Sequence, residues 1–185
     1  MNLKGFKGVL IYTAVIFLIS VVYFIYAHFA YPPTPERETI LHEIGEGFGE
    51  AGLWLLVFIY ARTVLKIILG KGAIAHRLLP DYHPPGNLPA INQFLGLLNR
   101  THVYVGITTV AIILIHIALM GLPMRILFFP AVLVLVLWQA LFGLFLNWRY
   151  TPAQIKKFSY VVHAQFITGI MIGIFAFFGH MLVED

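Results

Sequence analysis

The sequence predicts an all-α fold, a polytopic membrane bundle of five transmembrane helices in one domain covering residues 1–185. Of the 185 residues, 60% are hydrophobic and 11% are charged, and the mean hydropathy is +0.88. Soluble domains average about 25% charged residues, and a chain of this size cannot bury so much apolar surface in a globule. The apolar residues are also gathered into five stretches, each close to the length of about 20 residues that a membrane-crossing helix needs.

We expect the five spans to occupy, in order, Val9–Phe29, Gly49–Leu69, Val103–Gly121, Ile126–Leu146 and Phe158–Leu182.

The connections between the spans carry their own signals. Ala30–Phe48 contains three prolines followed by a glycine-rich acidic stretch, and the link around Leu122–Arg125 is short. Thr151 and Pro152 predict an N-cap followed by proline at the first position of the fifth helix. Gly70–Thr101 contains four prolines, and apolar residues then recur at helical spacing, which predicts a short interfacial helix before the third span: Ile91, Phe94, Leu95 and Leu98.

The distribution of lysine and arginine predicts the orientation, because cytoplasmic loops carry an excess of both. With the N-terminus in the cytoplasm, only Arg37 and Arg125 of the twelve basic residues face outside. We therefore expect an N-inside, C-outside protein, and the asymmetry favours a prokaryotic cytoplasmic membrane. The ten basic residues expected inside are Lys4, Lys7, Arg62, Lys66, Lys71, Arg77, Arg100, Arg149, Lys156 and Lys157.

Composition excludes several classes of function. The chain has no cysteine, so it cannot form disulfides, thiolate zinc sites, iron–sulfur clusters or covalently attached c-type haem. The sequence pI is about 9.4, but the positive charge is sorted by membrane side rather than clustered, so we expect no nucleic-acid partner.

Histidines inside the spans are the unusual feature, because an ionisable residue in a membrane helix marks a functional site by default. His102 and His116 lie 14 residues apart on the third span, on about the same face. His163 and His180 lie 17 residues apart on the fifth span, which runs in the same direction. We therefore expect His102 to face His163 near the cytoplasmic side and His116 to face His180 nearer the outside.

Two imidazoles from neighbouring helices can supply both axial ligands of a haem iron. The pattern predicts an inner haem b bound by His102 and His163 and an outer haem b bound by His116 and His180. Because glycine lets a flat ring approach the backbone, we expect three glycines to line the cofactors: Gly106, Gly169 and Gly173. Candidate partners for the haem propionates are Arg100, Arg149, Lys156 and Lys157 inside and Arg125 outside.

This pattern of paired histidines over Thr101–Leu182 resembles the ferric-reductase-like transmembrane domain, a family that includes NADPH oxidases and metalloreductases. The small di-haem membrane cytochromes b are a close alternative. The resemblance implies two b-type haems on the same four histidines. The 17-residue spacing is wider than the family's, so His28 or His42 is the alternative outer partner of His116.

A glycine-rich acidic stretch opens the second span. His42, Glu46 and Glu50 share one helical face with Glu43, and Gly45, Gly49 and Gly52 line another. One interpretation is acidic stabilisation of a helix N-terminus together with a glycine packing face. The other is a proton-accepting or metal-binding patch beside the outer haem, in which Glu50 is the most buried group.

The function expected from these observations is transmembrane electron transfer by a di-haem b-type cytochrome, with no catalytic residue of its own. We expect an electron-transfer subunit of an oxidoreductase, ferric-reductase-like or quinol-linked, that contacts membrane lipid and a redox partner subunit or quinone. The alternatives are a small transporter or proton channel that uses the His and Glu residues as a haem-free proton relay, and a non-redox anchor whose histidines bond neighbouring helices.

Overall fold

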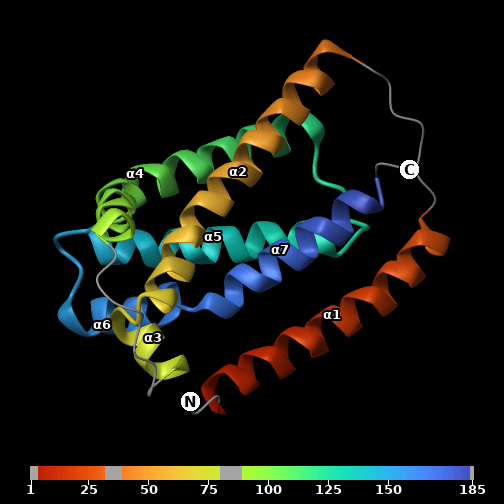
Figure 1. The fold of residues 1–185 in the computed structure, drawn as a ribbon. Helices are drawn as coiled ribbons and strands as arrows, with labels where there is room; N and C mark the ends of the chain where they lie inside the picture. Colours follow the sequence, from red (N-terminus) through yellow and green to blue (C-terminus); the bar gives the residue numbers. More distant parts are fainter. Residues whose placement is uncertain (1–3, 32–38, 80–88, 184–185) are drawn as a thin grey trace.

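The computed structural model describes residues 4–31, 39–79 and 89–183, and these form seven helices and no strand (Figure 1). In chain order they are α1 (Lys4–Ala30), α2 (Ile40–Ile68), α3 (Gly72–Leu78), α4 (Pro89–Met120), α5 (Phe128–Asn147), α6 (Ala153–His163) and α7 (Phe166–Met181). The predicted all-α class is confirmed over the described residues.

Four of these helices are long and apolar enough to cross a membrane by themselves: α1, α2, α4 and α5. The fifth predicted span is not one straight helix. It consists of α6 and α7, which bend by 48° at Ala164 and Gln165 and have the length and composition of a span only when taken together. By length and composition, the described helices are those of a multi-pass membrane protein with four candidate spans, or five if the bent pair crosses as one.

Two local predictions are wrong. The helical residues before the third span do not form a separate interfacial helix, because Pro89–Met120 is a single helix that carries both segments. Pro152 is the N-cap of α6 rather than its first helical residue, and the Thr151 hydroxyl is buried without a hydrogen-bond partner. The prolines of the two long connections mostly fall in residues 32–38 and 80–88, outside the described residues.

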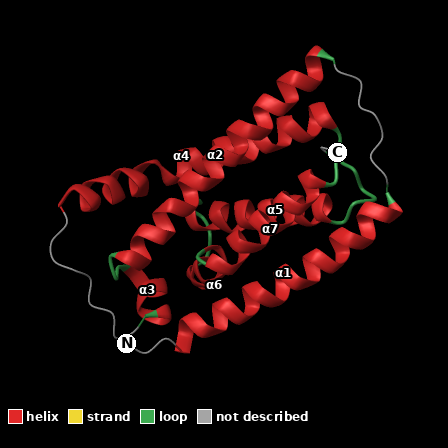
Figure 2. Ribbon diagram, turned by 45° about the vertical axis from the view of Figure 1, so that its right-hand side comes forward, coloured by secondary structure: helices red, strands yellow, loops and turns green. Residues whose placement is uncertain are grey.

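The helices form three layers that Figures 1 and 2 show from two directions. α2 packs along α4 on one side, α5 and α7 lie in the middle, and α1 covers α7 on the far side. The described part of α1 begins and that of α7 ends at opposite ends of the bundle. The layers place α4 opposite the α6–α7 pair, so their side chains can meet across the bundle.

The main apolar cluster lies where α1, α5 and α7 converge. Ala27 is fully buried, and the Phe128 ring contacts Phe178 with ring centres 5.9 Å apart. Ile126 and Leu182 complete this cluster. It fixes the end of α7 that carries His180.

Candidate functional site

Two pairs of histidine rings face each other between α4 and the α6–α7 pair. The ring centres of His102 and His163 lie 5.9 Å apart with an angle of 69° between the ring planes. The ring centres of His116 and His180 lie 6.1 Å apart with an angle of 27°. The structure therefore brings together the same two pairs that the helix directions and spacings predict.

The alternative partners of His116 lie elsewhere. His28 is on α1, where its ring contacts Phe24 and Phe29. His42 pairs with Glu46 on its own helix, with Nδ1 and Oε1 3.5 Å apart. His180 thus remains opposite His116 in spite of the wide spacing from His163.

Hydrogen bonds to backbone carbonyls fix the tautomers of three of the four rings. The Nδ1 atom of His116 lies 2.8 Å from the Gly45 oxygen, and that of His163 lies 2.9 Å from the Gln139 oxygen. His180 Nδ1 makes the same contact, at 2.8 Å, with the oxygen of Ala176 on its own helix. Because a carbonyl oxygen can only accept, each Nδ1 carries the proton and, in the neutral ring, Nε2 keeps a free lone pair.

His102 is the exception among the four. Its Nδ1 is buried and has no hydrogen-bond partner among the described residues. A buried polar nitrogen without a partner loses its hydration with no compensating bond. Within the described residues, the Nδ1 atom of His163 has a hydrogen bond and that of His102 has none.

Two glycines that the sequence analysis did not connect with histidine hold the rings in place. A Cβ at Gly49 would lie 2.8 Å from the His116 ring, and a Cβ at Gly143 would lie 3.0 Å from the His163 ring. Each glycine comes four residues after the carbonyl that its histidine bonds, Gly45 or Gln139. In an α-helix that carbonyl already accepts the amide of the residue four positions later. Glycine there leaves room for the imidazole to reach the carbonyl's second lone pair.

The three glycines predicted to line a cofactor have different surroundings. A Cβ at Gly106 or Gly173 would meet no atom within 4 Å, so both positions are open. Gly169 is not open, because the ring of Tyr60 from α2 lies directly against it. The space beside Gly169 is thus taken by a side chain of this protein, unlike that beside Gly106 and Gly173.

The predicted propionate partners are mostly solvent- or lipid-facing. Arg100, Arg125 and Lys157 are exposed, and Lys156 is half-buried. The exposed Arg149 guanidinium lies over the Tyr150 ring, 4.8 Å from its centre. Cations closer to a histidine pair come from α2 instead: the charges of Arg62 and Lys66 act on the His102 ring.

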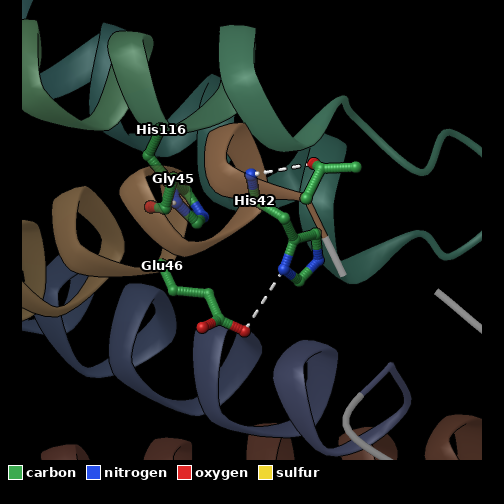
Figure 3. Close-up of polar contacts among 5 residues, drawn as sticks. His42, Gly45, Glu46 and His116 are labelled. Atoms are coloured by element: carbon green, nitrogen blue, oxygen red, sulfur yellow. Dashed lines mark hydrogen bonds and ion pairs between the residues drawn. The ribbon is translucent and has the colours of Figure 1, made fainter. Parts of the chain in front are cut away.

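The acidic stretch of α2 is arranged as the packing interpretation expects. Gly45, Gly49 and Gly52 face α4, where a Cβ on each would contact Met120, His116 and Ile113 respectively. Figure 3 shows the ring of His116 against the turn of α2 at Gly45, with Glu46 paired to His42 away from it. Glu50, expected to be the most buried of the three carboxylates, is exposed, as are Glu43 and Glu46.

The ring spacing fits a metal held by two imidazoles. A metal–nitrogen bond is about 2 Å long, and the centre of an imidazole lies about 1 Å behind its nitrogen, so two coaxial ligands place their ring centres about 6 Å apart. Both measured separations match this value. Among the described residues, no group of three or more His, Asp or Glu side chains gathers as a metal site.

Comparisons with protein-family models, characterised proteins and solved structures find no match to this chain.

Substituting Gly49 with Ala is expected to destabilise the protein by about 1–3 kcal/mol, the usual cost of forcing extra atoms into a packed contact. The new methyl group would push the His116 ring off the Gly45 carbonyl. Gly47→Ala is the matched control on the same helix, because a Cβ there meets nothing within 4 Å. Thermal unfolding in detergent measures both, and equal midpoints would contradict the proposed role of Gly49.

Gly143→Ala is expected to cost less than Gly49→Ala. The distance from the added Cβ to the ring is 3.0 Å rather than 2.8 Å, so His163 needs to move only slightly. Replacing glycine by alanine within a helix gains up to about 1 kcal/mol at both positions, so the contact distances decide the order. The same unfolding measurement tests the order, and a larger loss at Gly143 would show that the contact geometry does not control the cost.

Proposed function

We propose that this protein is a di-haem b-type cytochrome that transfers electrons across a membrane, with His102 and His163 binding the inner haem and His116 and His180 the outer one. Each haem would supply an iron centre that changes oxidation state by one electron.

The observation that carries the proposal is the outer histidine pair. His116 and His180 both use Nδ1 to donate to a backbone carbonyl, so neither neutral ring can donate a hydrogen bond to the other. Their ring centres nevertheless lie 6.1 Å apart, the spacing of two ligands on one metal. Each neutral ring keeps a lone pair on Nε2, and an electron-pair acceptor such as a metal between the rings would use both.

The chain's own residues would set the properties of both sites. The Nδ1 bonds to Gly45, Gln139 and Ala176 orient the imidazoles and increase the basicity of Nε2. If both imidazoles of a pair bound the iron, no position would be left for oxygen, and the bound haem would serve electron transfer rather than oxygen chemistry. The open backbone at Gly106 and Gly173 leaves room beside the pairs for a flat macrocycle.

The proposed setting is a prokaryotic cytoplasmic membrane, with the N-terminus inside. Electrons would pass between a quinone or cytoplasmic donor and an acceptor on the opposite side, through a partner subunit of an oxidoreductase complex. The exposed apolar side chains of α1, α2 and α4 support contact with lipid or with such a subunit, because isolated soluble proteins do not expose patches of this size.

The first test is haem content. The purified protein is expected to be red, to show the reduced-minus-oxidised bands of a b-type haem, and to hold two haems per chain. His102→Ala and His116→Ala should each remove one haem, because an axial ligand is lost. His180→Ala should do the same as His116→Ala, since both bind the same iron.

His28→Ala is the matched control, because His28 is also a membrane histidine but contacts only Phe24 and Phe29 among aromatic rings. It should retain both haems. Colourless, folded protein would overturn the proposal and favour the haem-free transporter or anchor. Retention of two haems by His180→Ala would reassign that ligand.

The second test concerns orientation. Reporters fused to the two termini are expected on opposite sides of the membrane, the N-terminal one inside, because ten of twelve basic residues then lie in the cytoplasm. Labelling with a membrane-impermeant reagent measures this. Both termini on one side would mean that α6 and α7 do not cross as one span.

A further inference from the structure

Two cations and an amide form a cluster beside the inner histidine pair that the sequence analysis did not single out. Arg62 and Lys66 lie one turn apart on α2 and are both half-buried. The Nε atom of Arg62 donates to Oδ1 of Asn99 at 2.7 Å. Asn99 is on α4, three residues before His102, so the bond ties the guanidinium to the helix turn that carries the ligand.

The cluster carries positive charge without an acidic partner. Among the described residues, neither Arg62 nor Lys66 lies within ion-pair distance of a carboxylate. The positive charge of Arg62 acts on both His102 and His163, and that of Lys66 acts on His102. Partly buried like charges that also repel each other are costly unless an anion joins them.

The geometry of Arg62 leaves a defined binding edge. Asn99 accepts the Nε hydrogen, and among the described residues nothing bonds the two Nη groups, which can therefore donate to the two oxygens of a carboxylate. Lys66 adds a second donor one helical turn away. Within the described ranges, no hydrogen bond fixes the side chain of Arg100 or Lys157, the exposed cations predicted from the sequence.

We infer that Arg62, held by Asn99, and Lys66 one turn away bind the carboxylate side chains of the inner haem. The inference rests on the proposed function and replaces the sequence-based candidates, among them Arg100, with residues of α2. A simpler explanation is that both cations only fix the topology of α2, and another is that they bind an acidic lipid headgroup. The inference and these two alternatives predict different results in the following experiment.

The test compares haem with its dimethyl ester, in which both carboxylates are neutral. The protein with His116→Ala is expected to hold only the inner haem. The rate at which this haem transfers to an excess of haem-free acceptor protein measures its dissociation. Arg62→Gln and Lys66→Gln should each speed haem loss about tenfold, as expected for the loss of about 1.4 kcal/mol. The ester should dissociate quickly from the parent and be insensitive to either substitution.

Arg100→Gln and Lys157→Gln are the matched controls, since they remove exposed cations expected at the same membrane side. They should change the rate by less than about twofold. In the unsubstituted background, Arg62→Gln should also lower the reduction potential of one haem only, because a positive charge near the iron favours the reduced state. This second readout does not depend on His116→Ala folding well.

Equal effects of Arg62→Gln on haem and on the ester would overturn the inference and leave a purely structural role. Unchanged haem dissociation rates and an unchanged reduction potential would also overturn the inference, and would leave Arg62 and Lys66 only the role of fixing the topology of α2. The same rates can be measured with the protein in vesicles of varied acidic lipid content. If haem and its ester then dissociated more slowly to the same extent as acidic lipid increased, a lipid headgroup would be the ligand of the two cations. A parent protein that binds no haem would refute the proposed function and this inference together, whereas a parent with two haems and unaffected variants refutes only this inference.

Discussion

Polar imidazoles inside an apolar bundle must find hydrogen-bond partners within the bundle itself, because lipid offers none. In the structure the helix backbone supplies these partners, since three of the four rings donate a hydrogen bond from Nδ1 to a backbone carbonyl. Two of those carbonyls belong to neighbouring helices and are reached only because glycine follows four residues later. The close packing of α2 on α4 and of α5 on α6 therefore depends on the same contacts that orient His116 and His163.

The break between α6 and α7 accounts for the unusual spacing of the second histidine pair. On a straight helix, residues 14 apart point in directions about 40° apart, whereas residues 17 apart differ by about 100°. His102 and His116 can thus share one face of the continuous helix α4. His163 and His180 cannot do so on a single helix, and the 48° bend after His163 lets both face α4. The bend is therefore part of the site.

The periodicity of the apolar residues and the distribution of charge predict most of the helices and the pairing of the histidines, because helices and pairs alike depend on spacing along single helices. They did not place the contacts between helices. The sequence shows a glycine row on α2, but nothing in it tells that Gly49 meets a histidine ring while Gly169 meets Tyr60. Likewise Arg62 resembles any basic residue at a span end, and only its bond to Asn99 relates it to His102. Helix breaks without proline or glycine, as at Ala164 and Gln165, leave no local signal.

The donor pattern also separates the candidate functions. Histidines that serve only to join helices would be satisfied once Nδ1 meets a carbonyl, and nothing would require two such rings to face each other. A proton relay needs a donor to alternate with an acceptor, but His116 and His180 in their neutral forms offer each other only acceptors. An excess proton or a metal would resolve this conflict. The separation of 6.1 Å between ring centres is longer than one shared hydrogen bond between coaxial rings would give, and it is close to the ring-centre separation of about 6 Å for two imidazoles on one metal, which favours the metal.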